Sequence, residues 1–429
     1  MRIVALDEAS RKDILVDLLK RDPNNYTAYS DTVQEIVDTV KRDRDAAVFS
    51  YTEQFDHAVI DASTIRVTEE EIEEAMRAVE PGLLEVMKRS MKNIRAFHEK
   101  QKTYSWFDSK PDGTILGQKI TALSSVGVYV PGGKAAYPSS VLMNIIPAEV
   151  AGVEKIVMVT PPGRDGKVNP VTLTAAYLAG ATEVYKVGGA QAVAALAYGT
   201  GTIPQVDKIV GPGNAYVAEA KRQVFGRVNI DMIAGPSEVL VLADDSANPE
   251  WLAADMLSQA EHDALASAIC ITDNEALAHD VIAELERQSA TLPRADIVRK
   301  SLADWSAVVL VPDMDAAIAL ANRVAPEHLE VLMREPWSVL PRIRHAGAVF
   351  LGPYAPEPLG DYFAGPNHVL PTLGTARFSS ALSVQTFCKR TSIIAASPAF
   401  AAANADAVAR LARMEQLEAH ARSMECRKQ

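Results

Sequence analysis

Residues 155–189 read KIVMVTPPGRDGKVNPVTLTAAYLAGATEVYKVGG, and the order of elements in this stretch decides the fold. The β-branched run Lys155–Thr160 ends in a Pro-Pro-Gly turn, and an alanine-rich helical segment follows from Pro170. A second β-branched run, Glu183–Val187, ends at Gly188-Gly189 before another helix. A strand, a helix and a second strand in this order predict a βαβ unit, and successive units of this kind build a parallel sheet.

The same rhythm continues toward the C-terminus. The short run Lys208–Val210 ends at Gly211-Pro-Gly-Asn214 before a helix. Further strands are predicted at Glu238–Ala243, Ser267–Thr272, Ala307–Val311 and Ala346–Leu351, with a helix near 249–262. We therefore predict an α/β fold with two successive parallel-sheet units and a boundary near Gly235-Pro236.

Both ends of the chain are predicted to be mainly helical. One helix is expected to begin at Ser10 and to use Ile14, Leu15, Leu18 and Leu19 as its apolar face. Thr68-Glu-Glu-Glu71 has the capping-box pattern and opens a segment that Pro81 interrupts before it continues to about His98. The tail from Pro398 to about Met424 is predicted to form one alanine-rich helix or two.

Length and composition are those of a globular protein. A chain of 429 residues has room for two or more domains, and its 48% hydrophobic and 23% charged residues argue against wholesale disorder. The net charge of -12 argues against a nucleic-acid partner, which would want a basic face. No apolar run is long enough for a membrane span, so no membrane partner is expected.

The N-terminus and the cysteines indicate a reduced compartment. Residues 1–7 lack the basic-then-apolar pattern of a signal peptide. Cys270, Cys388 and Cys426 lie far apart, in no spacing typical of a metal or redox site. We therefore expect a cytoplasmic protein with free thiols.

The segment Ala325-Pro-Glu-His-Leu-Glu330 places a carboxylate beside an imidazole. The preceding stretch, 313–324, has helical apolar spacing, and Pro326 cannot continue that helix. Glu327 and His328 are therefore predicted on a turn, where neither is needed for a ladder or an apolar stripe. An adjacent acid and base there can move protons. The alternative is a solvated Glu and a His that caps the last helical carbonyls.

Strands that end in glycine and feed helices present free backbone N–H groups, which suits a phosphate or a dinucleotide. The candidates are Gly127-Val-Tyr-Val-Pro-Gly-Gly133, Gly188-Gly-Ala-Gln191 and Gly211-Pro-Gly-Asn214. None has the GxGxxG spacing, so tight structural turns remain the alternative reading.

Several other polar residues have spacings that fit a metal site. Gln259 and His262 lie three apart at the end of a predicted helix, where both can ligate zinc or His262 can simply face the helix dipole. Asp361 lies in a long Gly- and Pro-rich loop, 352–371, and could be an anionic ligand. Glu415 and His420 are five apart, about 140° around a helix, and could both be solvent-facing charges.

Together these segments resemble the histidinol dehydrogenase family over essentially the whole chain. The matching strings are Tyr129-Val-Pro-Gly-Gly133, Gly188-Gly-Ala-Gln-Ala192, Gly211-Pro-Gly-Asn-Ala-Tyr216, Ala234-Gly-Pro-Ser-Glu238, Ser258-Gln-Ala-Glu-His262, Ala325-Pro-Glu-His-Leu-Glu330 and Ala364-Gly-Pro-Asn-His-Val-Leu-Pro-Thr372. The spacing of Glu415 and His420 also matches. One departure is Gln416, where the family often has Gly.

The resemblance implies oxidation of L-histidinol to L-histidine through the aldehyde, with two NAD+ and one water, as the last step of histidine biosynthesis. By the family pattern one zinc per subunit is bound by Gln259, His262, Asp361 and His420, and acts chiefly as a template for the substrate. Glu327 and His328 are the catalytic acid and base. Substrate contacts are Ser237, Gln259, His262, Glu327, Asp361, His368, Glu415 and His420. NAD contacts are Tyr129, Gln191 and Asn214.

The family fold implies two incomplete Rossmann-like domains with helical terminal segments, assembled as a homodimer. We expect an N-terminal helical segment at 1–30 and a first, discontinuous Rossmann-like domain at 31–125 and 236–380. The second Rossmann-like domain is expected at 126–235 and a C-terminal helical tail at 381–429. In this arrangement the tail residues Glu415 and His420 complete the partner's site.

Aldehyde oxidation often uses a cysteine thiolate. Cys270 is predicted in a buried strand, Cys426 lies in the tail, and Cys388 precedes Lys389-Arg390 without a glycine-rich catalytic frame. A second oxidation that uses water activated by Glu327 is therefore the better hypothesis.

Two other functions remain open. The first is a related zinc- and NAD-dependent dehydrogenase of another small polyol, such as a sulfonated diol. A sulfonate would require Arg or Lys at the position where the ammonium of histidinol would pair with Glu415. The second is a non-catalytic zinc-bound dimer that senses a nucleotide, and this function leaves Glu327 and His328 without a role.

Overall fold

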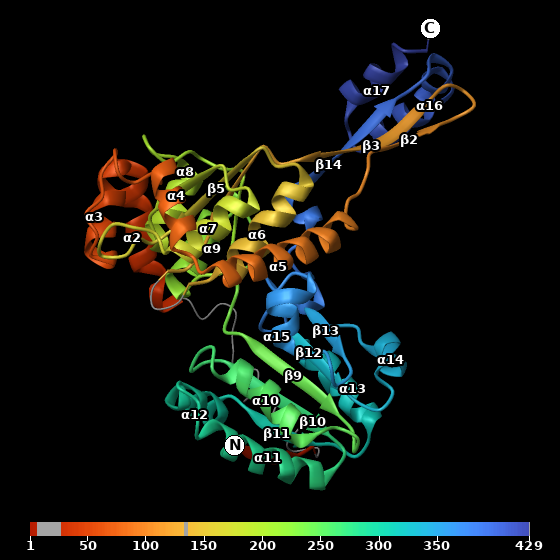
Figure 1. Cartoon of the computed structure of the whole chain (residues 1–429). Helices are drawn as coiled ribbons and strands as arrows, with labels where there is room; N and C mark the ends of the chain where they lie inside the picture. The colour runs from red at the N-terminus through yellow and green to blue at the C-terminus, as the bar shows by residue number, and fades with distance from the viewer. Residues whose placement is uncertain (7–26, 133–135, 429) are drawn as a thin grey trace.

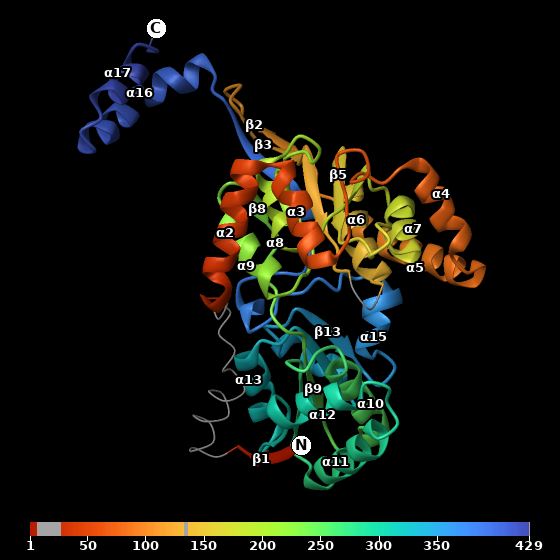
Figure 2. The same cartoon turned by 90° about the vertical axis from the view of Figure 1, so that its left-hand side faces the viewer.

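The computed structural model describes residues 1–6, 27–132 and 136–428 of the chain. Its strands form a six-stranded sheet, a five-stranded sheet and a three-stranded sheet. The five-stranded sheet with its helices forms the upper lobe in Figure 1, and the six-stranded sheet forms the lower lobe. Figure 2 shows the third sheet and the last two helices projecting from the upper lobe. The predicted α/β fold with parallel sheets is confirmed.

The five-stranded sheet is entirely parallel, in the order β6-β5-β4-β7-β8. Its strands are β4 (Ser125–Tyr129), β5 (Lys155–Thr160), β6 (Glu183–Lys186), β7 (Lys208–Val210) and β8 (Asn229–Ile230). Its helices are α6 (Pro138–Ala151), α7 (Pro170–Ala179), α8 (Gly189–Tyr198) and α9 (Ala215–Val224). The βαβ unit predicted from residues 155–189 is thus β5-α7-β6.

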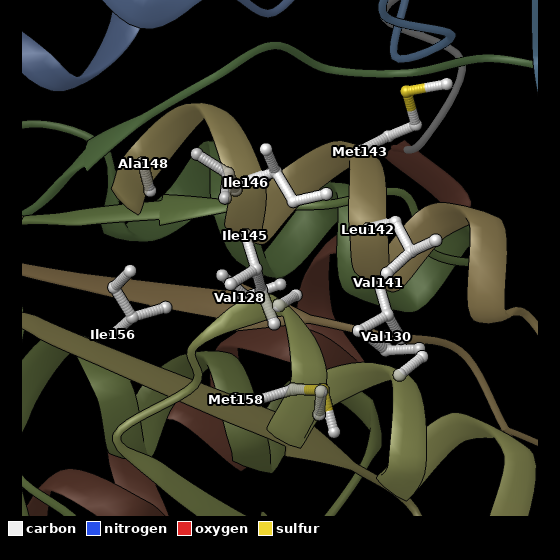
Figure 3. Packing of buried hydrophobic residues seen from close by; sticks show 14 of the residues in the cluster. Val128, Val130, Val141, Leu142, Met143, Ile145, Ile146, Ala148, Ile156 and Met158 are labelled. Atoms are coloured by element: carbon white, nitrogen blue, oxygen red, sulfur yellow. The ribbon is translucent and has the colours of Figure 1, made fainter. Parts of the chain in front are cut away.

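Alternating side chains give this sheet one apolar core on each face. Val128, Val130, Ile156 and Met158 pack against α6, as Figure 3 shows. Val157 and Val159 point to the opposite face and pack in the cluster that includes α8 and α9. Burial on both faces explains why these strands are continuous apolar runs without polar alternation.

The six-stranded sheet is also parallel, in the order β1-β11-β10-β9-β12-β13. Its strands are β1 (Arg2–Ala5), β9 (Glu238–Ala243), β10 (Ser267–Thr272), β11 (Ala307–Leu310), β12 (His328–Leu332) and β13 (Ala348–Leu351). Its helices are α10 (Pro249–Ala260), α11 (Glu275–Ser289), α12 (Ala295–Asp304), α13 (Met314–Val324) and the short α14 (Pro336–Val339), followed by the 3-10 turn η1 (Leu340–Arg342). Two short helical turns, α15 (Glu357–Leu359) and η2 (Gly360–Ala364), follow β13.

The N-terminal segment differs from the predicted helix at 1–30. Residues Arg2–Ala5 form β1, an edge strand that pairs with β11. Ile3 and Val4 are partly buried against the cores on the two faces of the sheet, and this tertiary pairing overrides local helix propensity. The helix expected from Ser10 lies outside the described residues.

Four helices precede the five-stranded sheet and pack on its helices. They are α2 (Thr27–Asp43), α3 (Asp45–Asp56), α4 (Glu69–Ala78) and α5 (Pro81–Glu99). Helix α2 contacts α8 and α9, α4 contacts α7, and α5 contacts α6. The expected grouping of 31–125 with 236–380 therefore differs from the packing, because the apolar faces of these helices complete the core of the other sheet.

Local signals in this helical region act as predicted. Thr68 and Glu71 form the reciprocal capping box at the start of α4. Pro81 is the first residue of α5, where a missing backbone N–H costs nothing.

The C-terminal region is a small module with a sheet. Strands β14 (Cys388–Ala395), β3 (Ile115–Ala122) and β2 (Trp106–Ser109) pair antiparallel in that order. Two 3-10 turns, η3 (Thr375–Arg377) and η4 (Val384–Phe387), lead into β14, and α16 (Pro398–Met414) and α17 (Glu418–Glu425) follow it. The expected helical tail at 381–429 thus begins with a strand, because residues 115–122 supply a long partner for it.

No helix in the described part of the chain is both long and apolar enough to cross a membrane.

The turn between α16 and α17 carries local strain. Gln416 has a φ of 62°, while Leu417 N–H donates to the Ala412 carbonyl across 2.8 Å to close the helix end. A residue with a Cβ adopts this left-handed conformation at a cost of about 1–2 kcal/mol. Glycine adopts it freely, which gives a physical reason for the glycine that the family often has there.

Replacing Gln416 with Gly should therefore stabilise the α16–α17 turn. Part of the gain is offset by the extra freedom of glycine in the unfolded chain, which leaves about 1 kcal/mol or less. Amide hydrogen exchange in α17 should slow by up to about fivefold. The control is Gln34→Gly, at an exposed position in the interior of α2. Because this backbone is already helical, the change should lower the free energy of unfolding by about 0.5–1 kcal/mol. Unchanged or faster exchange in α17 would show that the turn is not strained.

Candidate functional site

Glu327 and His328 lie at the amino end of β12, which runs between β9 and the edge strand β13. Helix α13 ends at Ala325, whose φ of 53° turns the chain, and Pro326 prevents its continuation. His328 then pairs in the ladder with Val239 of β9 and Ala348 of β13. The prediction of a free turn is therefore wrong for His328, because the strand begins at once after Pro326. Both side chains are buried.

Backbone groups of the neighbouring strand orient both side chains. The Glu238 backbone N–H donates to the Glu327 carboxylate across 2.9 Å. The His328 Nδ1 lies 3.1 Å from the Glu238 carbonyl oxygen. Because a carbonyl oxygen only accepts, Nδ1 carries a proton, and Nε2 is the ring atom left to exchange one. That Nε2 lies 3.6 Å from Asp361 Oδ1.

Burial and neighbouring charges shift the pKa values of this pair in the same direction. Burial raises the pKa of Glu327 to about 8, although the nearby His328 acts against the rise. Burial alone would lower the pKa of His328, but the carboxylates of Glu327 and Asp361 outweigh it and raise this pKa to about 10. Both groups are therefore mostly protonated near neutral pH, and each is a stronger base than an exposed counterpart once it has lost its proton.

A group of potential metal ligands lies next to His328. One ligand atom each from His262, Glu357 and Asp361 falls within 4.8 Å of the others. Gln259 is fully buried beside them at the end of α10, and both its amide atoms lack a hydrogen-bond partner among the described residues. An imidazole, carboxylates and an unpaired amide oxygen are donors that suit zinc, so the residues fit the metal that the resemblance implies.

Glu357 was missed by the sequence analysis. It lies between Pro356 and Pro358 in the loop that also carries Asp361, and its side chain accepts a hydrogen bond from Ser258 Oγ across 3.0 Å. Burial, followed by the Asp361 charge, raises the pKa of Glu357 to about 7. An acidic residue fixed between two prolines, four positions before Asp361, is the sequence signal that could have identified it.

The strand period places a further carboxylate on the His328 side of β12. Glu330 lies two residues on, hence on the same face, and is fully buried. Its Oε1 accepts the backbone N–H of Glu357 across 2.6 Å. Burial and the neighbouring Asp255 raise the pKa of Glu330 well above its usual range. This contact fixes the start of α15 against the sheet and so positions the ligand loop.

Two predicted substrate contacts border the same cluster. The His368 Nδ1 lies 3.0 Å from the Asp361 carbonyl oxygen, and burial lowers the pKa of His368. Ser237 directly precedes Glu238, the residue that orients Glu327 and His328. Together with the metal-ligand group, one locus contains the buried Gln259, Glu327 and His328, the partly buried Asp361 and His368, and the exposed His262, with Ser237 at its edge.

Glu415 and His420 are not brought to this locus within one chain. Glu415 is the C-cap of α16, and His420 lies in α17. The turn at Gln416 separates them, so the expected spacing around one helix does not apply. Both are exposed, and both views place α16 and α17 on the projecting module, far from α15 (Figures 1 and 2).

A second site lies at the carboxyl ends of the five-stranded sheet. A cavity of about 1140 Å³ is lined there by Tyr129, Gln191 and Asn214, the three predicted NAD contacts. The Tyr129 hydroxyl accepts the Gly189 backbone N–H across 3.2 Å at the start of α8. Both amide atoms of Gln191 are buried without a partner in the described part of the chain. These unpaired groups fit a polar ligand such as a dinucleotide.

The glycines of this cavity allow close packing of its loops. A Cβ on Gly188 would lie 2.6 Å from the Pro161 Cβ, and one on Gly211 would lie 2.1 Å from the Tyr129 carbonyl oxygen. Asp231, just after β8, accepts the Gly211 backbone N–H across 2.8 Å and pairs with the buried Lys221. Lys221 also donates to the Gly211 carbonyl across 3.0 Å. The loop before the Asn214 cap is thus held by a buried ion pair.

The cysteines do not have the environment of a nucleophile. Burial raises the pKa of Cys270, in β10, to about 12. Burial also raises the pKa of Cys388, despite the opposing charges of Arg390 and Lys208. Cys388 pairs with Ala122 in the projecting sheet. A raised pKa disfavours the thiolate, which agrees with the expectation of a second oxidation through water.

Comparison with known proteins supplies the family. A family model described as histidinol dehydrogenase matches residues 19–428. A histidinol dehydrogenase of Nitratidesulfovibrio vulgaris is 59% identical over 427 residues, which is 98% of each chain. The enzyme of Bacillus subtilis is 57% identical over 396 residues, or 92% of each chain. The crystal structure of histidinol dehydrogenase from Elizabethkingia anophelis matches with a TM-score of 0.94 at 36% identity, covering 100% of this chain and 98% of that one. This chain belongs to the histidinol dehydrogenase family.

Proposed function

We propose that this protein oxidises L-histidinol to L-histidine through L-histidinal, with two NAD+ and one water, as the last step of histidine biosynthesis in the cytoplasm. The observation that carries the proposal is the buried Glu327–His328 pair in contact with the ligand group of His262, Glu357 and Asp361. A proton-transfer pair beside a metal-type donor set is what oxidation of a chelating amino alcohol needs.

The two residues of the pair take successive protons. The neutral form of His328 takes the alcohol proton at Nε2 during the first hydride transfer, because its Nδ1 is engaged by the Glu238 carbonyl. Since the pKa of His328 is raised to about 10, this form gains population as the pH rises. The Glu327 carboxylate then takes a proton from the water that attacks the aldehyde. Asp361 stabilises the imidazolium that forms, since its Oδ1 faces Nε2 across 3.6 Å.

Zinc would be held by Gln259, His262 and Asp361 with His420 of a second subunit, and Glu357 lies within the same ligand group. When bound, the metal would supply a template that binds the imidazole and amino nitrogens of the substrate. Ser237, His368 and Glu415 would complete the contacts, with the Glu415 carboxylate facing the substrate ammonium. Tyr129, Gln191 and Asn214 would contact NAD in the cavity of the other lobe.

The charge of the site favours a cationic substrate over the sulfonated-diol alternative. Glu327, Glu330, Glu357 and Asp361 are gathered there together with Asp255. Among the described residues, none of the ion pairs of these carboxylates involves a lysine or arginine. A sulfonate would therefore find no lysine or arginine paired with these carboxyl groups, whereas a substrate ammonium would stabilise the charged form of carboxyls whose pKa is raised by burial.

The shared active site of a homodimer is part of the proposal. The projecting module exposes large apolar side chains, namely Tyr104, Trp106, Phe107, Ile394, Leu411 and Met414. Their clustering on one small module supports burial against a second copy of the chain. Such a partner would bring Glu415 and His420 to the locus that one chain leaves without them.

Turnover of L-histidinol tests the function directly. The protein should form two NADH per L-histidinol, while a sulfonated diol should give little or none. The His328→Asn variant should lower turnover of both alcohol and aldehyde by about 10²–10⁴-fold, and Glu327→Gln should slow the aldehyde stage more than the alcohol stage. NADH absorbance with each substrate measures both effects.

The partly buried His345, outside the locus, supplies the control. His345→Asn should turn over as the wild type does, and bound zinc should be unchanged in all three variants. Wild-type rates in His328→Asn would exclude His328 as the base. NAD+ binding without any turnover would favour the alternative function, a non-catalytic zinc-bound dimer that senses a nucleotide.

Metal removal should abolish activity and lower the affinity for L-histidinol. NAD+ binding should survive, because the dinucleotide cavity belongs to the other lobe. His262→Ala should reduce the bound zinc more than Gln259→Ala, since imidazole is the stronger ligand. Calorimetry of NAD+ binding and metal analysis measure these effects, and full activity of rigorously metal-free protein would contradict the metal site.

Mixing two inactive variants tests the shared site. In dimers of Asp361→Ala with His420→Ala, one site carries both defects and the other carries neither. Random subunit exchange should restore roughly a quarter of wild-type activity, because half of the dimers are mixed and half of their sites are intact. Verified exchange without recovery of activity would show that the tail acts within its own chain.

A further inference from the structure

Asp56 places its carboxylate on the wall of the dinucleotide cavity. It is the last residue of α3 and lines the cavity together with Tyr129 and Gln191. Its Oδ2 is buried and has no hydrogen-bond partner among the described residues. A buried acceptor of this kind is expected to be satisfied by something that the protein binds.

The other acidic residues of this wall are paired. Glu71 accepts from Lys186 and from the Thr68 backbone N–H. Both oxygens of Glu74 accept from Lys167 Nζ, at 2.8 and 2.9 Å. Of these three carboxylates, Asp56 is therefore the one with an oxygen free to accept a hydrogen bond from a ligand.

The position of Asp56 is also unfavourable for the free protein. A carboxylate at a helix C-terminus faces the negative end of the helix dipole. Burial raises the pKa of Asp56 to about 6, which reflects the loss of hydration of its charge. Hydroxyl or amino donors of a bound ligand would offset both costs.

The lobe lacks an acidic residue at the position where dinucleotide folds usually bind the ribose hydroxyls, and Asp56 can take that role. In dinucleotide folds an acidic residue following the glycine-rich turn, about 20 residues on, accepts from the ribose hydroxyls. Here the second strand of the lobe, β5, ends in Thr160-Pro161-Pro162, and Thr160 is buried. The next acidic residue, Asp165, is exposed and accepts the Lys167 backbone N–H across 3.1 Å.

The place of α3 fixes which half of the dinucleotide Asp56 would meet. Figure 1 shows α3 at the outer end of the upper lobe, away from α15, whereas α5 makes the contacts with η2. The nicotinamide must reach Glu327 and His328, near α15. The adenosine half then extends toward α3.

We propose that Asp56 accepts hydrogen bonds from the adenosine ribose hydroxyls of NAD+ and repels a 2′-phosphate, which makes this residue the determinant of NAD+ over NADP+. The inference rests on the proposed use of NAD+. Of the cations that line the same cavity, Lys167 is paired with Glu74, and Arg164 is exposed on the loop after β5, so solvent and salt screen its attraction for a 2′-phosphate.

The Asp56→Asn variant tests this inference through binding. The Kd of NAD+ should rise about 10-fold or more, as expected for the loss of hydrogen bonds to a charged group. The Kd of NADP+ should stay the same or fall, so the preference for NAD+ should narrow at least tenfold. Calorimetric titration of the metal-loaded dimer gives both constants.

Glu53→Gln is the matched control, since it removes an exposed carboxylate from the same helix one turn earlier. It should leave both Kd values within about twofold. Equal weakening of NAD+ and NADP+ by Asp56→Asn, or no change in either, would overturn the inference. Asp56→Ser should reproduce the narrowed preference, and thermal unfolding should show that both Asp56 variants are as stable as the wild type or more so.

ADP-ribose separates this inference from the proposed function. It carries the adenosine half but cannot accept a hydride, so its binding does not depend on turnover. If wild-type protein binds neither NAD+ nor ADP-ribose, the proposed function fails. If wild type binds ADP-ribose and Asp56→Asn binds it equally well, only the role of Asp56 is refuted.

Discussion

The reciprocal hydrogen bonds between Glu238 and Glu327 are the constraint on which the catalytic locus depends. The Glu238 N–H donates to the Glu327 carboxylate at 2.9 Å, while Glu238 Oε1 accepts the Glu327 N–H at 3.2 Å. The same Oε1 accepts the Leu373 N–H at 3.1 Å. Two buried carboxylates thus join the amino ends of β9 and β12 to the loop that follows His368. Without these contacts, neither the direction of the His328 ring nor the position of the loop would be defined.

The two lobes are held in register by polar contacts from single side chains. Ser90 Oγ and Asn93 Nδ2, both on α5, donate to the carbonyls of Tyr362 and Phe363 at 2.6 and 2.9 Å. The buried Asn367 donates to the Met143 carbonyl at 2.6 Å, next to His98. These bonds attach the η2 turn, which carries Asp361, to the helices of the other lobe. The proton-transfer site at the amino edge of one sheet and the cavity at the carboxyl edge of the other are therefore joined through these hydrogen bonds.

Local signals predicted the elements well, whereas pairings distant in sequence escaped prediction. The apolar runs ending in glycine gave β5, β6 and β7 because parallel strands buried on both faces need no alternation. The strand that begins at His328 was missed because Pro326 was interpreted as the start of a turn, and β14 was missed because Lys389 and Arg390 conceal a strand exposed on the surface. Sequence alone identified most residues of the locus through their family strings. Glu357 had no such string, and its role follows only from the contact with Ser258 and the proximity of Asp361.

The ion pair of Lys221 and Asp231 has a mechanical consequence. Asp231 stands at the start of the segment that leaves β8 and enters the other lobe at β9, and it also grips the Gly211 backbone. Lys221, on the helix α9 that Asn214 caps, pairs with Asp231 and donates a hydrogen bond to the Gly211 carbonyl. Any rotation of one lobe against the other pulls on this segment, so it is transmitted to the loop that lines the dinucleotide cavity. Where such a rotation alters the loop, linkage requires that occupancy of the cavity alters the angle between the lobes in return. The crossover between the lobes therefore acts as a lever and not as a passive tether.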